Sequence, residues 1–188
     1  MTNTKPRLPG DLKPAEVIER ILRVDHAGEY GAKRIYEGQL AVLKNAPSTP
    51  TIRHMAEQEM KHLAAFDKLL PERRARPTLL GPLWHVAGFA LGAATAMLGE
   101  KAAMACTEAV EEVIDAHYSR QLETLETLAA EGKAEPELAA LIEQFRAEEI
   151  EHRDTAREAG AQEAPAYPAL SQGVKAATRA AIWLSERI

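Results

Sequence analysis

The chain has 188 residues, a length that suits one domain with a substantial buried core. Its 23 basic and 28 acidic residues give a formal net charge of −5, which argues against nucleic acid as a partner. The single cysteine excludes an internal disulfide and a cysteine-based zinc site, and it fits a reducing compartment.

The hydrophobic pattern predicts helices along almost the whole chain. In chain order, the expected helices cover about 14–44, 50–70, 79–131, 136–159 and an amphipathic segment that reaches residue 188. Only 5% of the residues are aromatic, and no run of strictly alternating apolar and polar residues extends for more than a few residues. Both features argue against a β-rich fold. The sequence therefore predicts an all-α protein with one domain over residues 1–188, in which residues 1–13 form a flexible tail.

Two of the expected helices carry the same four-residue motif, EMKH at 59–62 and EIEH at 149–152. Residues three apart lie on one face of a helix, so the glutamate and the histidine of each motif can reach a common point. In the second copy Glu148 is also within reach of the histidine, but Gln58 at the equivalent position of the first copy argues against it. One motif alone would indicate only a solvated helix face.

Each motif follows a glutamate that has a tyrosine seven residues later. Glu29 is followed by Tyr36, and Glu111 is followed by Tyr118, so each tyrosine lies two turns along the face of its glutamate. The same spacing favours Glu111 over the neighbouring Glu112. The chain thus contains an internal repeat, offset by 82 residues (from 29 to 111) and by 90 residues (from 59 to 149).

This repeat predicts a metal centre between two helix hairpins. One glutamate from each of two helices and a Glu-x-x-His from each of the other two are the ligands of ferritin-like di-iron bundles. Four buried carboxylates would repel one another, and two divalent ions would balance their charge. A ligand set rich in oxygen suits iron or manganese better than a structural zinc site.

The predicted fold is therefore a ferritin-like four-helix bundle with an internal two-fold repeat and additional apolar or amphipathic helices. Glu59 and Glu149 are placed to bridge two ions, and Glu29 and Glu111 would be terminal ligands. The predicted metal ligands, which are also the predicted catalytic residues, are Glu29, Glu59, His62, Glu111, Glu149 and His152.

Other polar residues near these positions could support the ligands through hydrogen bonds. The candidates are Tyr36, Tyr118, His117, His26, Asp25 and Asp115. The two tyrosines could donate to the bridging carboxylates, or they could be core residues with satisfied hydroxyl groups. The others could equally be ordinary polar helix positions. His54 and His85 have no matching partner in the repeat and are expected to be structural.

The segment 77–99 contains no Asp, Glu, Lys or Arg. Its apolar part, 82–98, would be roughly 26 Å long as a helix, which is marginal for crossing a bilayer. The Gly-x3-Gly pattern at 88–92 would permit close contact with another helix. We expect this segment to lie in or dip into a membrane face together with the C-terminal amphipathic helix. The alternative is an ordinary buried helix or a homodimer seam.

Several segments together closely resemble the demethoxyubiquinone hydroxylases of ubiquinone biosynthesis. They are DHAGEYGAKRIYEGQ, MAEQEMKHL, ACTEAVEEVIDAHY, FRAEEIEHRD, APAYPAL and AIWLSERI. The resemblance runs from about residue 14 to the C-terminus. It implies a membrane-bound di-iron monooxygenase that uses O₂ to hydroxylate the ring of a demethoxy polyprenyl benzoquinone. The two iron ions would be held by the six predicted ligands, all of which are intact, and an external reductant, NADH-derived, would supply electrons.

The resemblance also implies the partners and the location. A polyprenyl quinone would be the substrate and a membrane surface the site of action, with homo-oligomers or other quinone-biosynthesis proteins as further partners. The targeting extension expected of mitochondrial relatives is missing, which favours a bacterial protein bound peripherally to the cytoplasmic side of the inner membrane.

Two other function classes share part of this pattern. A ferritin-like ferroxidase or iron-storage protein has the same ligand set, although the uncharged segment 77–99 would leave a large apolar patch on a soluble cage. A membrane helical protein without enzymatic activity, with solvated glutamates, is the third class.

Overall fold

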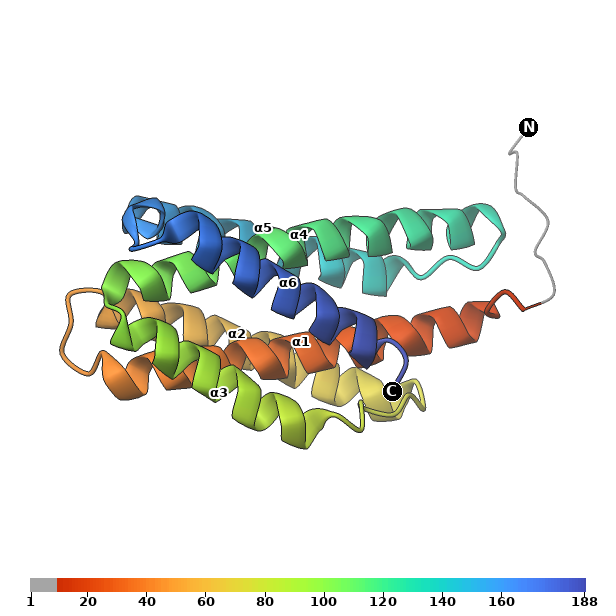
Figure 1. Ribbon diagram of the computed structural model, residues 1–188. Helices are drawn as coiled ribbons and strands as arrows, with labels where there is room; N and C mark the ends of the chain where they lie inside the picture. Colours follow the sequence, from red (N-terminus) through yellow and green to blue (C-terminus); the bar gives the residue numbers. More distant parts are fainter. Residues whose placement is uncertain (1–9) are drawn as a thin grey trace.

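The computed structural model describes residues 10–188, which are helical apart from short connections (Figure 1). Its helices are α1 (Pro14–Val42), α2 (Thr49–Glu72), α3 (Gly81–Met97), α4 (Glu100–Ala130), α5 (Pro136–Glu158) and α6 (Tyr167–Ser185), with a short 3-10 helix η1 (Ala161–Glu163) before α6. The all-α prediction is confirmed for this range. Most of the expected tail, residues 1–9, lies outside the described residues.

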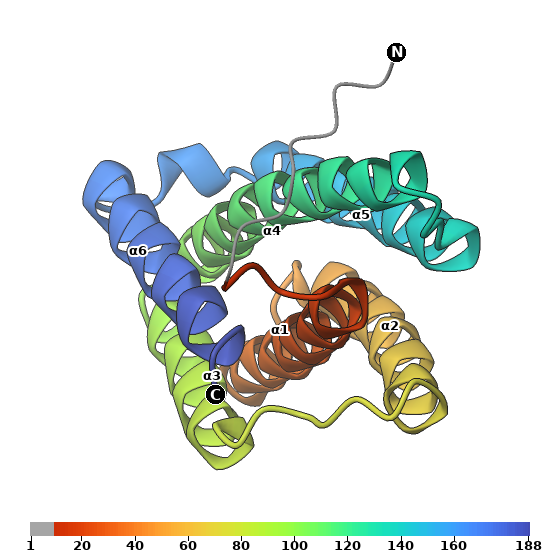
Figure 2. The ribbon, with the colours of Figure 1, turned by 90° about the vertical axis from the view of Figure 1, so that its right-hand side faces the viewer.

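Helices α1, α2, α4 and α5 form a bundle that Figure 2 shows from one end. The pair α1 and α2 makes one antiparallel hairpin, and the pair α4 and α5 makes the other (Figure 1). Helix α3 packs mainly on α1 and helix α6 packs mainly on α4. These two additional helices therefore cover the same side of the bundle, as expected from the predicted four-helix bundle with extra apolar and amphipathic helices.

Two apolar clusters fill the bundle on either side of its middle. One contains Leu22 from early in α1 and Phe66 from late in α2, together with residues from late α4 and early α5. The other contains Ile52 and Met104, from early in α2 and early in α4, with residues from the opposite ends of their partner helices. The repeated glutamates and histidines occupy the helix positions between these clusters, so apolar packing encloses them on both sides.

The prediction of a single helix over 79–131 is wrong in one respect, because α3 ends at Met97 and α4 begins at Glu100. Gly99 between them adopts φ +111°, a conformation that is open to glycine and strained for other residues. The turn sends the chain from α3, on the outside, into α4 of the bundle. A lone glycine within a run of helix-forming residues did not reveal this turn in the sequence.

The close contact predicted for the Gly-x3-Gly pattern is made with α1 of the same chain. Gly88 and Gly92 of α3 both face α1. A Cβ atom added to Gly92 would lie 1.9 Å from the carbonyl oxygen of Ile35, and one added to Gly38 would lie 2.2 Å from that of Phe89. The two helix backbones are therefore too close for any side chain at these positions.

The outer face of α3 is apolar and exposed. Leu83, Val86 and Met97 expose 51%, 65% and 70% of their surface, and Trp183 on the neighbouring α6 exposes 55%. One alternative for this segment was an ordinary buried helix. The exposed side chains of α3 show that the rest of the chain does not bury it. Within residues 10–188, every helix falls short of the length and hydropathy that crossing a bilayer requires.

The α1–α3 contact predicts the effect of a methyl group on stability. Gly92→Ala should destabilise the protein by about 1–3 kcal/mol, because the added methyl must displace the backbone of α1. The control is Gly173→Ala in α6, where a Cβ atom would meet nothing within 4 Å and alanine should stabilise the helix by about 0.5–1 kcal/mol. Urea unfolding measures both values, and equal stabilities would contradict the close contact.

Candidate metal centre

The six predicted ligands meet in the middle of the bundle. Each exposes 4% or less of its surface. Glu29 comes from α1, the first Glu-x-x-His from α2, Glu111 from α4 and the second Glu-x-x-His from α5. Each of the four helices of the bundle therefore contributes at least one side chain, in the arrangement that the repeat predicted.

These side chains form two groups of possible ligand atoms, each lying within 4.8 Å of one another. Glu59 and Glu149 belong to both groups. Glu29 and His62 complete one group, and Glu111 and His152 complete the other. The geometry thus has two adjacent positions for an ion, with two carboxylates available to bridge them.

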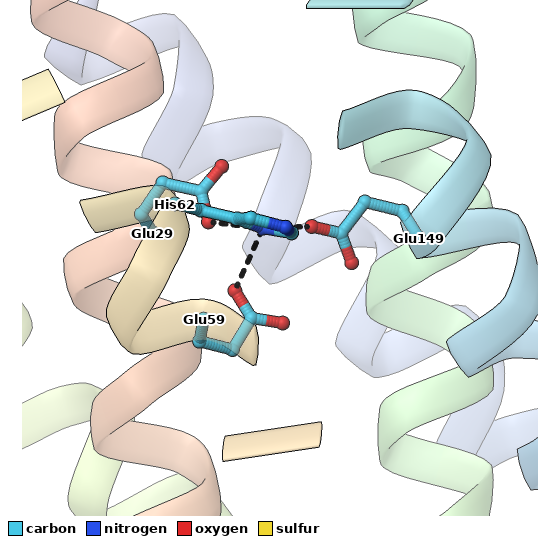
Figure 3. A group of neighbouring side chains, drawn as sticks. All are labelled: Glu29, Glu59, His62 and Glu149. Atoms are coloured by element: carbon cyan, nitrogen blue, oxygen red, sulfur yellow. Dashed lines mark hydrogen bonds and ion pairs between the residues drawn. The ribbon is translucent and has the colours of Figure 1, made fainter. Parts of the chain in front are cut away.

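His62 faces three carboxylates of the first group (Figure 3). Its Nδ1 lies 3.1 Å from Glu149 Oε1, 3.3 Å from Glu29 Oε2 and 3.9 Å from Glu59 Oε2. These three oxygens come from α5, α1 and α2, so the imidazole points to the place where the helices converge.

His152 occupies the corresponding place in the second group. Its Nδ1 lies 3.0 Å from Glu149 Oε2 and 3.3 Å from Glu59 Oε1. Glu149 therefore turns one oxygen towards each histidine, and Glu59 does the same. This is the orientation that a bridging carboxylate requires.

Burial and mutual repulsion perturb the titration of the cluster. Burial and the charge of Glu149 raise the pKa values of Glu59 and Glu111 well above the usual range. Burial opposes the ionisation of Glu149 as well, but hydrogen bonds from His152 and His62 lower its pKa to about 2. Burial disfavours protonation of His62, yet its contacts with Glu149 and Glu29 outweigh burial and raise its pKa to about 11.

Two buried oxygens of the cluster, Glu29 Oε2 and Glu59 Oε1, accept no hydrogen bond, although each lies 3.3 Å from a histidine Nδ1. Burying a carboxylate oxygen without a donor is costly, so these atoms fit a role as metal ligands. Four carboxylates and two imidazoles match the donor set that iron and manganese accept. The residues present therefore fit a pair of divalent ions.

The two tyrosines of the repeat donate to glutamates of the cluster, but not to Glu59 or Glu149, the candidate bridging carboxylates that were one of the two alternatives. Tyr36 donates to Glu111 Oε1 at 3.2 Å, and Tyr118 donates to Glu29 Oε1. Each tyrosine thus contacts the glutamate of the other half of the repeat. The antiparallel packing of α1 on α4 places these residues side by side, which spacing along one helix does not reveal.

Gln58 and Glu148 contact the cluster, although the sequence interpretation gave them no role. Gln58 Oε1 lies 2.9 Å from Nε2 of His152, and Glu148 Oε2 lies 2.8 Å from Nε2 of His62. Each residue precedes the glutamate of its own motif and contacts the histidine of the other. Their common offset of 90 residues (from 58 to 148) is the signal that could have found them.

Gln39 and Gln121 are a second pair that the repeat could have found, at the same offset as the tyrosines. Gln39 donates to the carbonyl oxygen of Ala103 at 3.0 Å, and Gln121 donates to Asp25 Oδ1 at 2.7 Å. His117 Nε2 lies 2.8 Å from Gln121 Nε2 and 3.5 Å from Asp25 Oδ1. The contacts of His117 are thus to Asp25 and Gln121 rather than to Glu111.

Three of the four remaining candidates have partners away from the cluster. Asp115 forms ion pairs with arginines of α5, and His26 pairs with an aspartate of α2. His85 is hydrogen-bonded to a tyrosine of α1, and His54 is exposed on α2. These four residues fit the structural interpretation.

An apolar cavity of about 260 Å³ adjoins the cluster. All four glutamates of the cluster line one part of it, and side chains of α3 and α6 line another. The lining residues from the two outer helices include Trp84, Gly88, Leu91, Ala181, Ile182 and Ser185. Trp84 Nε1 donates to Ser185 Oγ at 3.0 Å, which ties these helices together beside the cavity.

The raised pKa values predict how the stability of the metal-free protein depends on pH. Folded Glu59 and Glu111 keep protons that the unfolded chain, with pKa values near 4.5, releases. The free energy of unfolding should therefore fall as the pH rises above about 4.5. His62 acts in the same direction above pH 6.5, and the contribution of Glu149 is already complete above pH 4.5.

Thermal unfolding of the metal-free protein at a series of pH values measures how steeply its stability falls with pH. Glu59→Gln should make it shallower, because the amide does not titrate. Saturating Mn²⁺ should replace the protons and raise the melting temperature most at high pH. A metal-free protein that becomes more stable as the pH rises would contradict the raised pKa values of Glu59 and Glu111.

Comparison with known proteins gives the family. The family described as ubiquinone biosynthesis protein COQ7 matches residues 16–185. The chain is 60% identical over 183 residues to the 3-demethoxyubiquinol 3-hydroxylase of Rhodospirillum rubrum, covering 97% of this chain and 84% of that protein. It is 52% identical over 171 residues to the mitochondrial NADPH-dependent 3-demethoxyubiquinone 3-hydroxylase of Homo sapiens, covering 91% and 78%. Together with the matching motifs, these similarities show that the chain belongs to the COQ7 family of ubiquinone biosynthesis proteins.

Proposed function

We propose that this protein is a membrane-associated di-iron monooxygenase that hydroxylates the ring of a demethoxy polyprenyl benzoquinone, with O₂ as co-substrate. The observation that carries the proposal is the position of the two ligand groups, which share Glu59 and Glu149 at the wall of an apolar cavity. The names of its relatives state a hydroxylation of this class of substrate.

In this proposal each ion has one terminal glutamate and one histidine. Glu29 and His62 would hold one ion, Glu111 and His152 the other, and the two shared glutamates would bridge them. Bound there, the iron pair would supply the electrons that reduce O₂ for ring hydroxylation. The hydroxyl groups of Tyr118 and Tyr36 hold Glu29 and Glu111 in place, and burial keeps bulk water from the reacting atoms.

The cavity supports the choice of substrate. Its lining is mostly apolar, as a quinone ring and the first part of a polyprenyl tail require, and the cluster glutamates lie at its wall. Helices α3 and α6 contribute to this lining with one face and expose apolar side chains on another. A tail that leaves the cavity between these helices would reach the exposed apolar surface.

That surface also supports association with a membrane. The exposed side chains Leu83, Val86, Met97 and Trp183 would enter the apolar layer, and Arg187, 4.3 Å from the ring centroid of Trp183, would remain at the headgroups. We infer peripheral binding to the cytoplasmic side of a bacterial inner membrane, in keeping with the bacterial relative. The reductant would be a nicotinamide cofactor or a carrier reduced by one, and the names of several relatives specify NADPH.

The reaction can be tested with Glu111→Ala, which removes one carboxylate from the cluster. Ring hydroxylation should fall by at least about 100-fold, because one ion loses its terminal ligand. Cells carrying the variant as their only copy should accumulate demethoxyubiquinone, which mass spectrometry of extracted quinones measures. The exposed Glu57→Ala on α2 is the control and should make normal ubiquinone. Normal ubiquinone with disturbed iron handling in the Glu111→Ala strain would indicate a ferroxidase instead.

Membrane association can be tested by placing charge on α3. The double variant Leu83→Glu with Val86→Glu should shift the protein to the soluble fraction, since a charge in an apolar layer costs on the order of a few kcal/mol. The control is Met60→Glu, an exposed apolar position on α2, away from α3 and α6. Flotation with liposomes measures the shift, and equal flotation of both variants would contradict the proposed surface.

A further inference from the structure

The two halves of the cluster differ in the group that accepts a hydrogen bond from each histidine. Both histidines direct Nδ1 towards the cluster carboxylates and Nε2 away from them. Behind His62 the acceptor is a carboxylate oxygen of Glu148 at 2.8 Å. Behind His152 the acceptor is the amide oxygen of Gln58 at 2.9 Å.

Several contacts of the cluster are matched between the halves, although His62 Nδ1 also lies 3.3 Å from Glu29 Oε2. Glu29 accepts from a tyrosine and so does Glu111, and both halves share the two central glutamates. The distances from the two Nε2 atoms to their acceptors are nearly equal, so length does not distinguish these two hydrogen bonds. The difference between Glu148 and Gln58 is one of charge.

The structure holds the Glu148 carboxylate in place for this contact. Gln144, one turn earlier on α5, donates to Glu148 Oε1 at 2.9 Å and leaves Oε2 to His62. On α2 the residue one turn before Gln58 is His54, which is exposed. The Glu148 side chain is 27% exposed, so protein covers most of its surface.

A carboxylate behind a metal-binding imidazole changes the strength of that ligand. By accepting the Nε2 proton in a charged hydrogen bond, it raises the electron density at Nδ1 and makes this nitrogen a stronger donor. A neutral amide orients the ring as well but increases the basicity less. Removing such a partner typically lowers metal affinity by about 10- to 100-fold.

We propose that the two metal positions are unequal, that the position of Glu29 and His62 is filled first, and that Glu148 is the positioning residue that makes it the tighter one. Gln58 keeps the position of Glu111 and His152 weaker. This inference rests on the proposed di-iron centre and adds an order of loading to it. Unequal ions would also be distinguishable in their spectra before any turnover.

Metal titration of the metal-free protein tests the inference directly. Wild-type protein should bind Co²⁺, or Fe²⁺ without oxygen, in two steps whose affinities differ by about 10- to 100-fold, followed by calorimetry and visible absorption. His62→Ala should abolish the tight step. His152→Ala should leave the tight step and abolish the weak one.

Two reciprocal substitutions then exchange the acceptors while keeping their shape. Glu148→Gln gives both histidines an amide, so the tight step should weaken by about tenfold or more and approach the weak one. Gln58→Glu gives both a carboxylate, so the weak step should strengthen towards the tight one. The double exchange should reverse the order of filling, a result that a purely structural role for Glu148 would not produce.

Glu151→Gln is the matched control, since it makes the same charge change at an exposed position of α5. It should leave both affinities unchanged, and unfolding of the metal-free variants checks that all of them fold alike. Wild-type steps of equal affinity, or a Glu148→Gln variant that binds like Glu151→Gln, would refute unequal loading while the di-iron centre stands. Wild-type protein that binds neither metal would refute the centre as well.

Discussion

The mutual repulsion of four carboxylates buried in one helical bundle is the constraint on which the rest of the structure depends. No arrangement of apolar side chains can compensate such a charge, so the interior must supply protons, imidazoles or metal ions. The two histidines and two tyrosines that point at the glutamates meet part of this need. The apolar clusters at either end of the bundle hold the helices together against the repulsion.

The supporting contacts cross between the two halves of the repeat. Tyr118 of the second half donates to Glu29 of the first, and Glu148 of the second half contacts His62 of the first. Neither helix hairpin therefore has a complete site by itself, and closing the bundle completes both positions at once. A duplicated sequence that exchanges its contacts in this way is also free to diverge at single positions, as it does at Gln58 and Glu148.

The two outer helices connect this polar interior to an apolar exterior. Helix α3 can lie directly on α1 because glycines remove the side chains between them. Its apolar residues are then divided between the cavity beside the cluster and the exposed surface. The same pair of helices thus forms part of the proposed substrate site and the proposed membrane-binding face. In this proposal the substrate would enter from the bilayer in which a polyprenyl quinone dissolves.

The sequence alone determined the helices and the six residues that cluster, because the helical period dictates which residues share a face at spacings of three and seven. It did not determine the turn at Gly99, since a backbone with positive φ there depends on where α3 packs. Nor did it determine the acceptors of the tyrosines and histidines, or that the glycine pattern of α3 meets α1. These contacts join residues far apart in the chain, and only the antiparallel packing of the helices decided which of them meet.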